Sequence, residues 1–353
     1  MRTKRLLSTA LLCLLGMFLI VKGSQFIIRA REITKTEPLE PASINSSEVD
    51  AYPGASPNDP VGGDGGAEEQ SGPLMPVAPL GDSENHIDAA EDYGFELEPR
   101  TVKQGGFAVL TLTGEGRDLV QVKTPFAEPL VWGEHNGVRT ALLPIKWTCD
   151  LGEYLITADG GGHHEEFLLS VVDGEFPVQD LQVDTSITQS TINSNSANDE
   201  YMAKAQPVKS QAIDHSLWDG VFLRPVEGGW RSTEFGSIRY VNGVYTERHG
   251  GEDLAVAAGT PVWAANDGKV LFAEYLQLTG NTVCIEHGLG LKTWYYHMNE
   301  LHVTAGQDVK KGDVIGLVGS TGFSTGAHLH FGASIGTVWV DPELLLAGTV
   351  LPE

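Results

Sequence analysis

The C-terminal part of the chain, from residue 217 onward, consists of short runs of β-type residues separated by glycine turns. Representative runs are GKVLFAEYL, NTVCIEH, LKTWYYH and HLHFGAS. Apolar and β-branched residues fill these runs, and the 3.6-residue apolar period of an amphipathic helix is nearly absent. The sequence therefore predicts a compact antiparallel β domain over residues 217–353.

Residues 92–184 carry a second set of short strands, such as FAVLTLTG, GEYLITADGGG and EEFLLSVVD. Each run is bounded by turn residues and shows partial apolar alternation, which is typical of a β-sandwich. We therefore predict an immunoglobulin-like β-sandwich here and an all-β fold class for the chain. Residues 185–216 are polar, so we expect a linker with a short helix near residues 198–205 that Pro207 ends.

The N-terminus predicts the compartment. Arg2, Lys4 and Arg5 precede an unbroken apolar run, LLSTALLCLLGMFLIV, over residues 6–21. A basic segment followed by such a run is typical of a signal peptide or a signal anchor. We favour an anchor within residues 1–24, because no Ala-x-Ala cleavage site is present. The rest of the chain is therefore expected outside the cytoplasm, attached to the membrane by this segment, or secreted if the segment is cleaved.

Charge excludes one class of partner. The chain has 353 residues and a formal net charge of −24. A protein that binds nucleic acid needs a basic face against the phosphates, and no such face is visible, so we expect no nucleic-acid partner. Residues 25–91 are acidic and rich in Pro, Gly and Ser, and are predicted to be a disordered linker. No protein partner can be inferred.

Four histidines and one aspartate of the C-terminal domain form the candidate site. They are His249 and Asp253 in HGGED, His297 in WYYHM, and His328 and His330 in HLHF. Strand side chains alternate between two faces, so residues two or four positions apart point the same way. His249 is thus expected on one face with Asp253, and the HLHF histidines share a face while their apolar neighbours point to the core.

Three of these residues suit a metal ion. His249, Asp253 and one histidine of HLHF supply two imidazoles and a carboxylate, which leaves the fourth position of a zinc ion for water. Such a water titrates near neutrality and attacks as hydroxide. The remaining HLHF histidine and His297 would lie beside it, one to take its proton and one to donate to the developing oxyanion. Magnesium or calcium would require more oxygen ligands.

Residues 222–346 resemble the lysostaphin/LytM-type zinc metalloendopeptidases, which cleave peptide bridges of bacterial peptidoglycan. The motifs that carry the resemblance are RSTEFGSIR, HGGED, GTPVWAANDGKV, GNTVCIEHG, TWYYHM, GQDVKKGDVIGLVGSTGFSTG and HLHF. The resemblance implies that His249, Asp253 and His330 bind one Zn²⁺ ion and that His297 and His328 are the two catalytic histidines. It also implies peptidoglycan peptides, either cross-bridges or stem peptides, as the substrate.

The sequence departs from the family pattern at three positions. Glu252 replaces a usually apolar residue and is expected to add negative charge near the metal, Met298 replaces a leucine, and Gly332 replaces an acidic residue after HLHF. A family tyrosine that assists the reaction has two candidates, Tyr240 and Tyr245. The alternative function is a catalytically silent wall-binding scaffold or a regulator of another wall hydrolase. The sequence does not reveal which peptide bond is cleaved.

Overall fold

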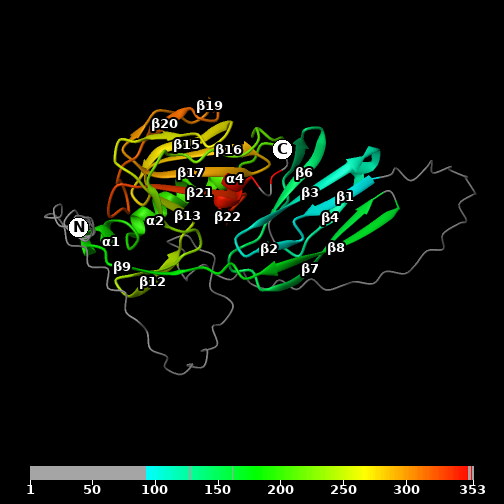
Figure 1. Cartoon of the computed structure of the whole chain (residues 1–353), viewed down its shortest axis with the longest axis horizontal. Helices are drawn as coiled ribbons and strands as arrows, with labels where there is room; N and C mark the ends of the chain where they lie inside the picture. Colours follow the sequence, from blue (N-terminus) through cyan, green and yellow to red (C-terminus); the bar gives the residue numbers. More distant parts are fainter. Residues whose placement is uncertain (1–92, 127–128, 161, 349–350, 352–353) are drawn as a thin grey trace, which may run out of the picture. The chain divides into compact units, whose positions relative to one another are not determined.

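The computed structural model describes residues 93–126, 129–160, 162–348 and 351 (Figure 1). Strands dominate the described residues, as the all-β prediction requires, with four short α-helices and one 3-10 helix. None of the described helices is long and apolar enough to cross a membrane. The predicted signal anchor and the predicted linker over residues 25–91 lie outside the described residues.

Residues 93–172 form two four-stranded sheets around one apolar core. The strands are β1 (Tyr93–Glu98), β2 (Thr101–Lys103), β3 (Phe107–Gly114), β4 (Gln121–Lys123), β5 (Trp132–His135), β6 (Val138–Pro144), β7 (Gly152–Gly160) and β8 (His163–Val172), with a 3-10 helix at Glu115–Leu119. One sheet has the order β1-β3-β6-β5 and the other β2-β8-β7-β4. This is a β-sandwich; its narrower assignment as immunoglobulin-like stays a prediction.

The central strand β3 of the first sheet has apolar residues buried on both of its faces. Leu110 and Leu112 of β3 point into the sandwich core. Phe107 and Val109, which alternate with them, belong to a second apolar cluster made mostly of C-terminal residues. Backbone hydrogen bonds add to this contact, because the N–H of Glu134 donates to Asp214 at 3.3 Å and the N–H of Ser216 donates to Glu134 at 3.0 Å.

The predicted polar linker contains the short helix expected near residues 198–205, but more of it is folded than predicted, which corrects the linker prediction. The chain after the sandwich forms β9 (Val178–Leu181), α1 (Thr185–Ser190), α2 (Asn195–Lys204) and α3 (Gln206–Lys209). Ser194 caps α2 by accepting a hydrogen bond from the N–H of Ala197 at 3.3 Å. Tyr201 and Val208 are buried in a cluster with Trp294. These apolar residues are too few to give the segment a helical hydrophobic pattern in sequence. They are buried only because the C-terminal domain supplies the surface they pack against.

The sandwich ends with β8, because β9 belongs to a different sheet. It pairs in parallel with β11 (Ile238–Val241), which pairs with β12 (Val244–Arg248). The predicted sandwich boundary at residue 184 therefore includes a strand that belongs to the C-terminal domain. The parallel register sets Gln179 opposite Arg239.

The C-terminal domain is built on an eight-stranded sheet with the order β10-β13-β21-β17-β16-β15-β19, in which β22 pairs with β21 (Figure 1). These strands are β10 (Trp230–Thr233), β13 (Gly251–Ala255), β15 (Gly268–Leu276), β16 (Gly280–Gly288), β17 (Leu291–Met298), β19 (Asp308–Val309), β21 (Leu329–Ile335) and β22 (Val338–Val340). Three further strands, β14 (Pro261–Trp263), β18 (Glu300–Leu301) and β20 (Val314–Leu317), form a small sheet, and α4 spans Glu343–Ala347. Every pair in the large sheet is antiparallel, which confirms the predicted antiparallel β domain.

Candidate metal centre

Three neighbouring strands set the spacing of the site. Asp253 of β13 lies opposite His330 of β21, and His330 lies opposite Tyr296 of β17. Leu329 and Phe331, on either side of His330, are fully buried in the apolar core. One face of β21 therefore supports the fold while the other carries the polar site, as strand alternation predicts.

The three residues predicted as ligands meet in the structure. The Nε2 atom of His249 lies 2.8 Å from Nδ1 of His330 and 3.0 Å from Oδ1 of Asp253. Nδ1 of His330 lies 3.1 Å from the same carboxylate oxygen. One candidate ligand atom from each residue therefore lies within 4.8 Å of the other two, and all three residues are buried.

The protonation states of these groups suit a cation. Nδ1 of His249 donates to the backbone carbonyl of Glu234 at 3.0 Å, so the lone pair of a neutral ring is on Nε2. Burial, with Arg239 nearby, lowers the pKa of His249 to about 3, and burial also lowers the pKa of His330. Two neutral imidazoles and a carboxylate that converge on one point fit a divalent metal ion.

Arg239 holds the other oxygen of Asp253. Its Nη2 donates to Oδ2 of Asp253 at 2.8 Å, and each side chain is only 10% exposed. Burial acts to raise the pKa of Asp253, but His249 and Arg239 hold it well below its usual value. The carboxylate is therefore ionised, with Oδ1 facing the histidines and Oδ2 facing the guanidinium. Arg239 ends the motif RSTEFGSIR, but the sequence did not single it out as a site residue.

The two predicted catalytic histidines lie beside this cluster. The ring centroids of His297 and His328 are 4.7 Å apart, and Nε2 of His328 lies 3.7 Å from Oδ1 of Asp253. Nδ1 of His297 donates to the carbonyl of Thr321 at 2.8 Å, and Nδ1 of His328 donates to that of Gly326 at 2.8 Å. Each ring is thus held by the backbone through Nδ1, which leaves Nε2 as the basic atom.

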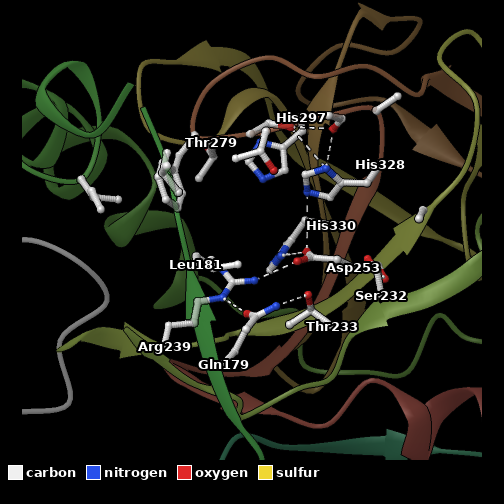
Figure 2. A pocket seen from close by; sticks show the side chains of 18 of the residues that line it. Gln179, Leu181, Ser232, Thr233, Arg239, Asp253, Thr279, His297, His328 and His330 are labelled. Atoms are coloured by element: carbon white, nitrogen blue, oxygen red, sulfur yellow. Dashed lines mark hydrogen bonds and ion pairs between the residues drawn. The ribbon is translucent and has the colours of Figure 1, made fainter. Parts of the chain in front are cut away.

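A cavity of about 300 Å³ opens over these groups. Figure 2 shows Asp253 and His330 between His297 and His328 on one side and Arg239 on the other. Hydroxyl-bearing residues from β10 and the loop before β21 line much of the remaining wall, namely Ser232, Thr233, Ser324 and Thr325. Asp253, His330, His297, His328 and Arg239 therefore all line one open cavity.

The tyrosine candidates lie elsewhere. Neither Tyr240 nor Tyr245 is among the described residues that line the cavity, and the two rings contact each other edge to face with centroids 5.9 Å apart. Tyr245 is 55% exposed. The choice between them stays open, and neither reaches the site in this structure.

Two of the departures from the family pattern have a structural account. Glu252 alternates with Asp253 along β13, so its side chain points away from the site. Its Oε2 lies 3.8 Å from Nη1 of Arg231. The prediction that Glu252 adds negative charge beside the metal is therefore wrong. Gly332 lies next to the distal nitrogen of His330, because a Cβ atom there would be 3.5 Å from Nε2. That buried Nε2 has no hydrogen-bond partner among the described residues.

Comparison with known proteins places the site in a family. The sequence pattern of peptidase family M23 matches residues 247–342. The peptidoglycan DD-endopeptidase ShyA of Vibrio cholerae is 40% identical over 110 residues, which are 30% of this chain and 25% of that protein. The DD-carboxypeptidase/endopeptidase Mpg of Neisseria meningitidis is 45% identical over 94 residues, which are 27% of this chain and 22% of that protein. The chain thus spans about a quarter of the length of these relatives.

A solved structure extends the similarity beyond that segment. A crystal structure from Pseudomonas aeruginosa, described as a candidate peptidase M23, is 25% identical to this chain with a TM-score of 0.52. The match covers 69% of this chain and 94% of that one. The chain therefore carries a domain of peptidase family M23.

Proposed function

We propose that the protein is a zinc-dependent endopeptidase that cleaves peptide cross-bridges or stem peptides of bacterial peptidoglycan. The observation that carries the proposal is the convergence of His249, Asp253 and His330 on one point beside His297 and His328. Relatives named peptidoglycan DD-endopeptidase share this domain, which supports a wall peptide as the substrate.

Zinc suits this donor set better than the hard divalent cations. Two imidazole nitrogens and one carboxylate oxygen are typical ligands of catalytic zinc, whereas magnesium and calcium prefer more oxygen atoms. A zinc ion bound by these residues would supply Lewis-acid activation of the attacking water and of the scissile carbonyl. His249, Asp253 and His330 would hold it.

His297 and His328 would move the protons. With Nδ1–H bonded to a backbone carbonyl, each neutral ring can accept a proton only at Nε2. Nε2 of His328 lies 3.7 Å from Oδ1 of Asp253, beside the proposed ligands, so we assign it to take the proton of the attacking water. A ring that has taken this proton becomes a donor, to the developing oxyanion or to the leaving amine.

We further infer that the protein acts outside the cytoplasm. The basic residues before the apolar run over residues 6–21 support a membrane anchor, or secretion if that segment is cleaved. The order of strands in the sandwich supports an immunoglobulin-like module that serves as a spacer or a recognition surface.

The test is digestion of defined peptidoglycans by the purified protein, with the released fragments identified by mass spectrometry. We expect cleavage of one type of peptide bond, its loss on chelation and its recovery when zinc is restored. Wall binding without bond cleavage, under saturating zinc and with several cross-link chemistries, would favour the wall-binding scaffold instead.

A further inference from the structure

Strand β9 and the segment after it lie upstream of the family match at residues 247–342, yet they form one wall of the cavity. Exposure alternates along β9: Gln179 and Leu181 are partly buried on the cavity side, while Val178 and Asp180 are exposed. Figure 2 shows Gln179 beside Arg239, at the end of the cavity away from His297. The site is therefore completed by residues outside the family segment.

Gln179 is connected to the site by a chain of hydrogen bonds. Its Oε1 accepts from Nε of Arg239 at 3.0 Å, and Nη2 of Arg239 donates to Oδ2 of Asp253 at 2.8 Å. Its Nε2 donates to Oγ1 of Thr233 at 3.0 Å. Arginine is only a donor, so the amide oxygen must face Arg239, and the bond to Thr233 fixes the amide nitrogen on the other side.

This series of hydrogen bonds determines which carboxylate oxygen of Asp253 faces the two histidines. Arg239 occupies Oδ2, so only Oδ1 faces His249 and His330. Arg239 and Asp253 are almost completely buried, and a buried ion pair is stabilising only when its geometry is held closely. Without the acceptor on Gln179, the Nε–H of Arg239 loses its partner in a buried position, and the guanidinium is free to turn away from Oδ2.

We propose that Gln179 is a positioning residue of the metal centre, which acts through Arg239 to hold Asp253 as a ligand with one oxygen atom. The inference rests on the proposed function, because it takes His249, Asp253 and His330 as metal ligands. The hydrogen bonds of the Gln179 side chain are to Arg239 and Thr233, not to His249, Asp253 or His330. Its effect is on the orientation of the carboxylate, and hence on the affinity and geometry of the metal site.

The test is metal binding by the full-length protein, measured without any substrate. Metal-free protein is titrated with zinc against a chromophoric chelator, and the visible absorption of the cobalt(II) form reports the coordination number. Gln179→Leu removes the acceptor, Gln179→Glu retains it, and Asp180→Asn is the matched control on the exposed side of β9. Circular dichroism of each metal-free variant reports folding.

We expect Gln179→Leu to weaken zinc binding about 10-fold. This is the lower end of the loss in metal affinity that is typical when a residue supporting a metal ligand is removed. The cobalt spectrum of Gln179→Leu should change, because the released Oδ2 enters the coordination sphere. Gln179→Glu and Asp180→Asn should match the wild-type protein in both measurements. If Gln179→Leu does not fold, Gln179→Asn replaces it with the same expectation, because its shorter side chain cannot reach Arg239.

Wild-type affinity and spectrum in Gln179→Leu would overturn the proposal. Equal losses in Gln179→Leu and Gln179→Glu would also overturn it, because the glutamate keeps the acceptor. A wild-type protein that binds no zinc would refute the metal assignment itself, which is a failure of the proposed function and is distinguishable from the other two results.

Discussion

The ring of Tyr296 lies parallel to the ring of His330, with centroids 4.7 Å apart and planes 6° apart. Both residues are buried, and the pairing of β17 with β21 sets them directly opposite each other. The phenol ring thus covers one face of the imidazole and restricts its rotation.

We therefore expect Tyr296→Leu to weaken zinc binding about 10-fold, because His330 loses the surface that orients it. Tyr296→Phe keeps the ring and should bind zinc like the wild-type protein. Chelator competition measures both. Wild-type affinity in the leucine variant would show that strand pairing alone orients His330.

Replacing His297 tests the chemical role of its imidazole, provided that the new residue tolerates the same backbone conformation. His297 has a φ of 63°, in the left-handed region that asparagine adopts more readily than most residues. We expect His297→Asn to fold and bind zinc normally, while the rate of peptidoglycan cleavage falls by about 10²- to 10⁴-fold. An unchanged rate would remove His297 from the mechanism, and lost zinc binding would assign it a structural role.

Loss of the metal should lower the stability of the protein. Zinc at about 1,000 times its dissociation constant adds about 4 kcal/mol to the free energy of unfolding. We therefore expect the melting temperature of the wild-type protein to fall on chelation and to recover with zinc. Asp253→Asn preserves the volume of the side chain but weakens the donor, so its melting temperature should respond little to either treatment. A strong response in this variant would mean that the ion binds elsewhere.

A buried ion pair supports the sheet away from the site. Nζ of Lys292 lies 2.9 Å from Oε2 of Glu286, and neither side chain is exposed. Glu286 also accepts hydrogen bonds from the backbone N–H groups of Ile213 and Gly290, at 3.3 and 3.0 Å. Lys292→Met leaves a buried carboxylate without its counter-ion and should cost about 3–5 kcal/mol in chemical denaturation. A loss below about 1 kcal/mol would show that the backbone donors suffice.

The pH dependence of stability should include a contribution from His287. Burial lowers the pKa of His287 from 6.5 to about 4. Between these values the unfolded chain binds a proton that the folded protein does not, so stability falls as the pH falls from 6.5 to 4. At about 1.4 kcal/mol for each pKa unit, the loss from this residue is about 3 kcal/mol. His287→Gln should have a shallower slope in this range; an unchanged slope would assign the loss to other groups.

Local patterns were sufficient to predict the five candidate residues. Strand alternation places His328 and His330 on one side while Leu329 and Phe331 enter the core, and the structure agrees. His249 and Asp253 are also close in sequence, but the expected strand alternation does not relate them, because His249 lies between β12 and β13. Their roles as ligands and catalysts stay predictions, but the structure brings all of them together.

Long-range pairing was not predictable in the same way. Gln179 and Arg239 are 60 positions apart, and only the register of β9 against β11 brings them together. No local pattern specifies that register. Tyr201 likewise becomes part of a core only through a surface built by residues such as Phe272 and Trp294, so the polar segment around it resembles a linker in sequence.

The pairing of β9 with β11 also bears on how this domain can be transferred between proteins by recombination. Recombination that transferred only residues 247–342 would leave behind both strands, and with them Gln179 and Arg239. The recipient would acquire the ligands without the guanidinium that orients one of them. For this protein, the segment that carries both the candidate ligands and the residues that orient Asp253 is therefore longer than the segment that the family pattern matches.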